Sequence, residues 1–253
     1  MSERTPLILQ QPLQPEWVQI PVEQLTQGLI LLLNKPYGWT SADAVRKIKF
    51  MAQKHWGIKN IKVGHAGTLD PLATGVLLIC LGKATKLAES LQAERKVYIA
   101  SICVGATTPS FDLEKEIDRH FPFEHITQAQ TETVLTQFVG PQDQMPPQFS
   151  AKMVGGTRAY QWARAGEEAP LQAAKIEIYE ISLLSFELPY IRIKIACSKG
   201  TYIRALARDI GLALDSGAYL SDLERTQSGG FHVEQALAID NLEKIFPLLS
   251  KKD

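Results

Sequence analysis

Residues 64–75 read Gly-His-Ala-Gly-Thr-Leu-Asp-Pro-Leu-Ala-Thr-Gly. They place one carboxylate, Asp70, among glycine, proline and small side chains. Gly64, Gly67 and Gly75 permit positive φ angles or close approach of another chain segment. Pro71 fixes its own backbone and disfavours the α-helical region for the residue before it. The pattern predicts an aspartate held in a defined position by a loop; the alternative is a turn in which this aspartate only caps the next element.

Charge is segregated along the sequence although the formal net charge is zero. Residues 31–100 contain eleven lysines and arginines but only four acidic residues, and residues 192–208 add five cations without an acid. Acidic residues gather instead at 112–124 and 167–187. Because Asp70 lies inside the basic region, the pattern favours an anionic polymer such as nucleic acid as partner. Lysines scattered over solvated faces are the alternative.

Composition excludes several protein classes. No apolar run approaches the roughly 20 residues that cross a bilayer, and the N-terminus lacks a secretory signal pattern. The three cysteines, Cys80, Cys103 and Cys197, are widely spaced among apolar residues. This spacing predicts core thiols in a reducing compartment, not disulfides or a zinc site. We therefore expect a cytoplasmic protein without a membrane segment.

The order of predicted elements indicates an α+β fold. Strands and helices are intermixed without strict βαβ alternation, so we expect a mixed, largely antiparallel central sheet flanked by helices and loops. Residues 1–27, rich in Gln and Pro, are expected to form a flexible arm, and residues 28–253 a single catalytic domain. Strands are predicted near 29–34, 76–81, 96–104, 175–186 and 190–197, and helices near 41–56, 83–92, 127–138, 157–166 and 201–214.

The segment from Cys197 to Arg204 is the second informative one. A strand ends at Cys197, Gly200 makes a turn and Thr201 is predicted to cap a helix. A cation in the first turn of a helix is unfavourable for the helix dipole. We therefore expect Arg204 to have an acidic or phosphate partner; a surface arginine held by a nearby glutamate is the alternative.

Motifs of other enzyme classes are absent from the sequence. There is no Gly-x-Ser-x-Gly elbow, no Walker phosphate loop and no dinucleotide-binding Gly-x-Gly-x-x-Gly. The histidines lack metal-ligand spacing, and no His-x-Glu occurs with a Cys-x-x-Cys as in zinc deaminases. What remains is an enzyme built on one aspartate, with no cofactor and no metal.

Six motifs in order resemble the TruB family of tRNA pseudouridine synthases, over about residues 28–231. They are Asn34-Lys35-Pro36-x-Gly38-x-Thr40-Ser41, residues 64–75, Arg95-Lys96-x-Tyr98, Pro146-Pro147-x-Phe149-Ser150-Ala151, residues 197–204 and Leu223-x-Arg225-Thr226. The resemblance implies the pseudouridine synthase fold. It also implies isomerisation of a uridine in the T arm of tRNA, usually called uridine 55, to pseudouridine. We expect a monomer whose partner is the tRNA T stem-loop.

The resemblance also implies roles for six residues. Asp70 matches the catalytic aspartate, Arg204 the arginine that pairs with it, and Tyr98 the tyrosine that stacks on the target base and assists proton removal from C5. His65 matches the histidine that splays the T loop, and Tyr202 and Leu223 match substrate-pocket positions. Taken singly, Tyr98 reads as a half-buried strand tyrosine, His65 as a turn histidine and Leu223 as core.

The implied chemistry agrees with the residue types. A uridine inside a folded loop must be everted before a side chain can reach it, and an aromatic ring can stack on the everted base. Burial would favour the neutral form of a carboxylic acid, whereas a guanidinium at contact distance keeps it ionised. The isomerisation is redox-neutral, so it requires no cofactor.

Three departures from the family pattern accompany the resemblance. Many relatives continue into a C-terminal PUA-like RNA-binding module, which we expect this chain to lack. Glu224 stands where relatives often have a second arginine, and Lys152 lies one place earlier than the usual lysine. The alternative functions are pseudouridine formation in another RNA, and RNA binding or folding without catalysis.

Overall fold

The structure is a computed structural model that describes residues 6–13 and 20–249. The chain divides into two compact units, and each of them contains part of the predicted catalytic domain, residues 28–253. Unit 1 comprises Met1–Lys96 and Glu224–Asp253, and unit 2 comprises Val97–Leu223. Strands β5 (Lys96–Val104) and β13 (Ala218–Ser228) carry the chain from one unit to the other.

The sheet of unit 1 is built around β4 (Ala73–Leu81), whose nearly continuous apolar run is buried. β2 (Leu29–Lys35) pairs antiparallel with β4, from Leu29 opposite Leu81 to Lys35 opposite Gly75. β3 (Val63–Ala66) also pairs antiparallel with β4. A short β1 (Leu7–Leu9) lies parallel to β2, and β14 (Phe231–His232) pairs with the end of β13.

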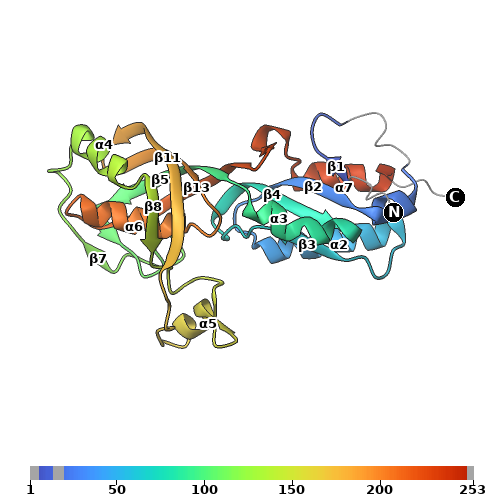
Figure 1. Ribbon diagram of the computed structural model, residues 1–253, viewed down its shortest axis with the longest axis horizontal. Coiled ribbons are helices and arrows are strands. Elements are labelled where there is room, and N and C mark those ends of the chain that lie inside the picture. The colour runs from blue at the N-terminus through green and yellow to red at the C-terminus, as the bar shows by residue number, and fades with distance from the viewer. Residues whose placement is uncertain (1–5, 14–19, 250–253) are drawn as a thin grey trace. The chain divides into compact units, whose positions relative to one another are not determined.

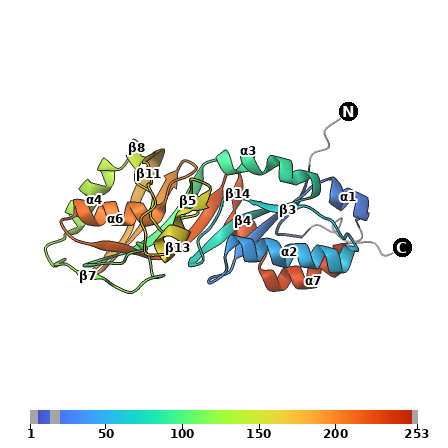
Figure 2. The same ribbon diagram turned by 90° about the horizontal axis from the view of Figure 1, so that it is seen from below.

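Helices cover both faces of this sheet (Figure 2). α2 (Ser41–Trp56) and α7 (Ile239–Leu249) pack side by side on one face, where the Trp56 and Phe246 rings stack with centroids 4.8 Å apart. The other face packs Ile30, Leu32 and Leu78 against the 3-10 helix η2 (Gly82–Leu87) and α3 (Ala88–Ala93). Burial on both faces explains why β2 and β4 read as apolar runs without alternation. The described part of this unit also contains the short helices α1 (Val22–Gln27) and η3 (Val233–Gln235).

Unit 2 contains strands in the order β5, β12 (Tyr190–Cys197), β11 (Ala174–Glu187) and β8 (Gly140–Gln144). β11 pairs antiparallel with both of its neighbours. α4 (Gln128–Gln137) and α6 (Ile203–Ala213) pack near these strands (Figure 1). A small lobe contains β9 (Met153–Val154), β10 (Thr157–Arg158) and α5 (Ala159–Arg164). Elsewhere in unit 2, β6 (Ala106–Thr107) pairs antiparallel with β7 (Arg119–His120).

The predicted α+β class is confirmed, with small shifts in element bounds. The bounds predicted for β5 and β12 are those observed, and α4 begins after Thr127, its N-cap. The predicted helix over 83–92 is a 3-10 helix followed by a short α-helix, because Gly82 and Thr85 begin a tighter turn. The predicted helix over 157–166 is shorter, since residues 157–158 pair with 153–154.

The sequence predicts Ser41 as the N-cap of the helix near 41–56 and Thr201 as the N-cap of the helix near 201–214, and both are wrong by one residue. Thr40, not Ser41, caps α2: its side chain accepts from the Asp43 amide, and the Asp43 carboxylate accepts from the Thr40 amide. Likewise α6 follows Tyr202, and the hydroxyl of Thr201 donates to Ser198 O instead of capping the helix. In both cases the hydroxyl expected to cap bonds elsewhere.

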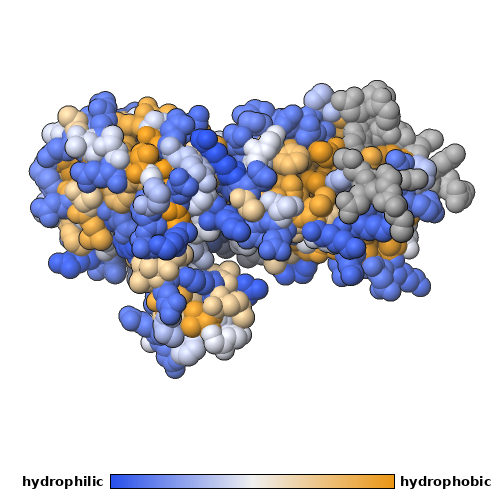
Figure 3. All heavy atoms as spheres, in the orientation of Figure 1, coloured by the Kyte–Doolittle hydropathy of each residue, from blue (hydrophilic) through white to orange (hydrophobic). Residues whose placement is uncertain are grey.

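The surface seen in Figure 3 is largely hydrophilic, with apolar side chains visible on the lobe around α5. Met153 in this lobe is 56% exposed. Within residues 6–13 and 20–249, no helix is both long and apolar enough to cross a membrane.

Candidate active site

Asp70 lies on the loop that joins β3 to β4 in unit 1. The two strands keep a tight register, with His65 opposite Ile79 and Ala66 opposite Leu78. The loop is fastened to the first residue of α2, because the Ser41 hydroxyl accepts from the Leu69 amide at 2.9 Å and donates to Leu69 O at 3.0 Å. Asp70 O in turn accepts from the Ala73 amide at 3.1 Å. The loop therefore presents the Asp70 side chain, which is partly exposed, from a fixed backbone.

The ammonium group of Lys35 fixes the other side of the loop. Lys35 is fully buried at the end of β2, and its Nζ donates to the carbonyls of Pro36 at 2.9 Å, Trp39 at 2.7 Å and Pro71 at 3.2 Å. Burial lowers the pKa of Lys35 to about 8, and the nearby Asp70 carboxylate opposes this shift. Lys35 therefore places a cationic centre beside the loop that carries Asp70.

Arg225 of β13 holds the loop from a third direction. It is 1% exposed, and its Nε donates to Val76 O at 2.7 Å, one terminal nitrogen to Gly67 O at 3.1 Å and the other to Thr68 O at 3.5 Å. Gly67 and Gly75 have φ of +90° and +96°. The guanidinium thus satisfies carbonyls that the glycine-rich turn leaves outside the sheet ladder.

His65 stands on β3, at the base of the same hairpin. Burial lowers the pKa of its imidazole, and the positive charge of Arg225 lowers it further. Its Nδ1 is buried without a hydrogen-bond partner in the described part of the chain. The imidazole is therefore biased toward its neutral form, and its unpaired Nδ1 is shielded from solvent.

The lowered pKa of Lys35 predicts a pH dependence of stability. Below about pH 8 the amine is protonated in both states, whereas between about 8 and 10.5 the folded state loses the proton that the unfolded state keeps. The free energy of unfolding contributed by this group therefore rises with pH across that window. We therefore compare the free energy of unfolding of the wild-type protein with that of Lys35→Met, measured by urea titration. This difference should shift by about 2 kcal/mol in favour of the wild type between pH 7 and pH 9.5.

Lys49→Met is the matched control for this prediction, since Lys49 is an exposed lysine on α2. The difference between wild type and this control should be the same at both pH values. If the difference between wild type and Lys35→Met were also the same at both pH values, the pH dependence assigned to Lys35 would be contradicted.

Arg204 occupies the first turn of α6 in unit 2 and is 2% exposed. Its Nε lies 3.5 Å from Asp112 Oδ2, and its terminal nitrogens donate to Ser110 O at 3.1 Å and Phe149 O at 3.0 Å. The predicted acidic partner therefore exists, and it is an aspartate from the acidic stretch 112–124. Anchoring by two carbonyls and one carboxylate orients the guanidinium in a single direction.

The other predicted residues of unit 2 are positioned by the elements around them. The backbone of Tyr202 is clamped by Gln144, whose amide accepts from Tyr202 N at 2.8 Å and donates to Tyr202 O at 3.1 Å. Tyr98, 9% exposed, lies on β5, and Leu223, 6% exposed, lies on β13. Burial of Leu223 fits a core position as well as a pocket position.

The predicted site residues thus divide between the units. His65 and Asp70 share one hairpin of unit 1, and Tyr98, Tyr202, Arg204 and Leu223 belong to unit 2. The pairing of Asp70 with Arg204 and the meeting of Asp70 with Tyr98 remain predictions. The sequence alone did not predict the role of Arg225. The one feature that could have indicated it is an arginine on a buried strand, two residues after Leu223.

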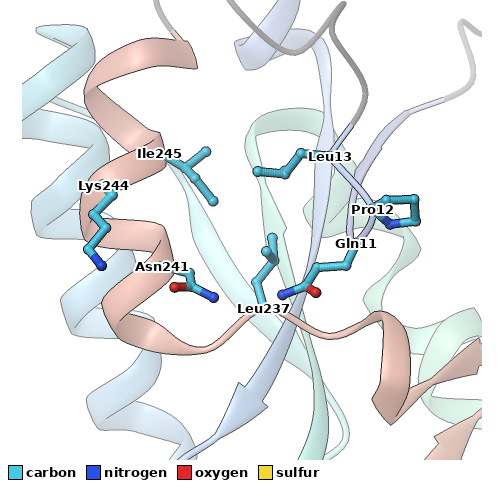
Figure 4. A pocket seen from close by; sticks show the side chains of 7 residues that line it. All are labelled: Gln11, Pro12, Leu13, Leu237, Asn241, Lys244 and Ile245. Atoms are coloured by element: carbon cyan, nitrogen blue, oxygen red, sulfur yellow. The ribbon is translucent and has the colours of Figure 1, made fainter.

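A hollow away from these residues lies between residues 11–13 and α7 (Figure 4). Its volume is about 300 Å³, and Leu13 and Ile245 face each other across it. None of the predicted site residues lines it, and its only charged lining group is Lys244.

Comparison with known proteins identifies the family. Residues 53–203 match the family described as TruB family pseudouridylate synthase (N terminal domain). A protein of Phocaeicola vulgatus named tRNA pseudouridine synthase B is 54% identical over 215 residues, which cover 85% of this chain and 92% of that protein. Proteins with the same name from Flavobacterium johnsoniae and Clostridium kluyveri are 47% and 42% identical, with 97% and 72% of their lengths covered.

Solved structures agree with this assignment. A Cbf5-Nop10-Gar1 complex contains a chain with TM-score 0.67 and 28% identity, and the match covers 95% of this chain and 63% of that chain. An H/ACA RNP bound to a substrate RNA containing 2'-deoxyuridine contains one with TM-score 0.64 and 27% identity, covering 94% of this chain and 61% of that chain. The chain therefore belongs to the TruB family of pseudouridine synthases.

Proposed function

We propose that this protein converts a uridine in the T arm of tRNA, at the position usually numbered 55, to pseudouridine, with Asp70 as the catalytic group. The observation that carries the proposal is the Asp70 loop, which Ser41, Lys35 and Arg225 hold from three sides. The relatives named tRNA pseudouridine synthase B support tRNA as the substrate. The proposal includes a monomer acting in the cytoplasm.

The first requirement of this reaction is an everted uridine. Unstacking the base costs a few kcal/mol, which contacts with the protein must offset. We assign the stacking contact to Tyr98 and the splaying of the T loop to His65, which stands at the base of the hairpin that carries Asp70. Tyr202 and Leu223 line the proposed base pocket.

The bond changes balance without an added reactant. The Asp70 carboxylate promotes cleavage of the bond between N1 of uracil and C1' of ribose by one of two routes. It attacks the sugar or the base and forms a bond that breaks again before the product leaves, or it assists an elimination in which the proton removed from the sugar is later returned to it. Uracil stays in the pocket and rotates, and its C5 then bonds to C1'. C5 gives up its proton with assistance from Tyr98, and N1 takes one up. The reaction involves no net oxidation or reduction, and no water is consumed.

Release of hydrogen from C5 tests the proposed function. A tRNA transcript with tritium at C5 of its uridines should release one tritium per tRNA into water when incubated with the purified protein. A transcript with cytidine in place of the T-loop uridine should release none. A protein that binds the tRNA but releases no tritium would contradict the proposal.

The basic region of unit 1 predicts a salt dependence of tRNA binding. Lys49, Lys54 and Lys59 are exposed cations on α2 and the loop after it. Each phosphate contact contributes about 0.7–0.9 to the slope of log affinity against log salt. Replacing all three lysines by glutamine should reduce this slope by about 2, measured by filter binding at several salt concentrations.

The matched control replaces three exposed lysines outside the basic region, Lys115, Lys175 and Lys244. This variant has the same net charge as the first but should keep the wild-type slope. Equal slopes for the two variants would show that the basic region is not the binding footprint.

A further inference from the structure

The turn before α2 is bonded directly to the loop that carries Asp70. Residues 36–39 form this turn, with the Trp39 amide donating to Pro36 O at 3.4 Å. Pro71 O accepts from the Gly38 amide at 2.9 Å and from Lys35 Nζ at 3.2 Å. The same Nζ also binds both ends of the turn, at Pro36 O and Trp39 O. The turn and the residue after Asp70 therefore form one hydrogen-bonded assembly.

Tyr37 stands at the tip of this turn and is 59% exposed. Its backbone is restrained on both sides, because Pro36 has a fixed φ and the Gly38 amide donates to Pro71 O. The helix α2 begins three residues after Gly38 with a complete capping box. An aromatic ring on so constrained a backbone loses little conformational entropy when it binds a ligand.

We propose that Tyr37 is a further substrate-binding residue, whose ring stacks on a nucleobase of the RNA next to the everted uridine. This inference rests on the proposed function. Exposed aromatic rings stack on unpaired bases, and a loop whose target base has been everted offers such bases beside the reaction centre. The hydrogen bonds from the turn to Pro71 O place Tyr37 beside the loop that carries Asp70. Tyr37 itself takes no part in the chemistry.

The inference is tested by tRNA affinity, which is measured independently of turnover. Loss of a stacked base by alanine substitution costs about 1.4 kcal/mol, so Tyr37→Ala should raise the Kd for tRNA about tenfold. Tyr37→Phe keeps the ring and should stay within about twofold of wild type. Because Tyr37 is exposed, both variants should melt at the wild-type temperature.

Tyr179→Ala is the matched control, since Tyr179 is also an exposed tyrosine, 42% exposed on β11. It lies in the acidic stretch 167–187, outside the basic region proposed to bind tRNA. Its Kd should remain within about twofold of wild type.

Turnover gives a second reading of the same variants. Tyr37→Ala should raise KM about tenfold and leave kcat within about twofold, because the ring binds a neighbouring base that does not itself react. An unchanged Kd for Tyr37→Ala would overturn the inference, as would an equal loss for Tyr37→Phe, which would assign the effect to the hydroxyl. A wild-type protein that binds tRNA without releasing tritium would contradict the proposed function, and the Kd comparison would still decide the role of Tyr37.

Discussion

Asp70→Asn should abolish pseudouridine formation and leave tRNA affinity within a few fold of wild type. Asparagine has the same shape but cannot act as an anion, so the N1–C1' bond would lose the group that promotes its cleavage. We expect the single-turnover rate to fall by at least about 10³-fold. The rate is measured by tritium release and the affinity by filter binding on the same transcript.

Asp240→Asn provides the control for this prediction, because Asp240 is an exposed aspartate in the first turn of α7. It should turn over at the wild-type rate. Turnover retained by Asp70→Asn would remove this carboxylate from the proposed mechanism. A parallel loss of affinity and rate would assign Asp70 to RNA binding instead.

Gly75→Ala should destabilise the fold of unit 1 by about 3 kcal/mol. Its φ of +96° disfavours any side chain, and a Cβ there would lie 2.2 Å from Arg225 O and 2.7 Å from Arg225 N. These are backbone atoms of the neighbouring strand, so no side chain can move away to relieve the overlap. Strain and overpacking of this kind add to about 3 kcal/mol, or a fall of about 10 °C in Tm.

Gly230→Ala is the matched control in the same unit. A Cβ at Gly230 would meet no heavy atom within 4 Å, and its φ is not positive. Its Tm should stay within about 2 °C of wild type. If Gly75→Ala had the same Tm as this control, the close packing of β4 against the backbone of Arg225 would be contradicted.

Local sequence patterns predicted the regular elements well where one face is buried. The alternation of Tyr98, Ala100 and Ile102 defines β5, and the alternation in residues 190–197 defines β12. The caps were misplaced for a physical reason. Ser41 has a suitable hydroxyl, but that hydroxyl bonds Leu69 across 28 residues of sequence, and this leaves the capping position to Thr40.

The support of the candidate site was harder to predict because it depends on long-range contacts. The motif around residues 64–75 singled out Asp70, but the bonds from Arg225 to Val76 and Gly67 connect segments about 150 residues apart. The partner of Arg204 was predicted only by charge, and Asp112 lies in a stretch with no periodic pattern. The structure also contains a strand and a helix, β1 and α1, inside the predicted arm. The sequence indicated β1 only by the apolar run Leu7–Leu9 and α1 only by the residues before Gly28.

The most direct test of the account is carbodiimide mapping of an unmodified tRNA transcript incubated with the purified protein and a chelator, without added cofactor. The account predicts one new carbodiimide adduct, at the T-loop uridine, with wild-type protein and none with Asp70→Asn. An unmodified T-loop uridine, or an adduct that also forms with Asp70→Asn, would contradict it.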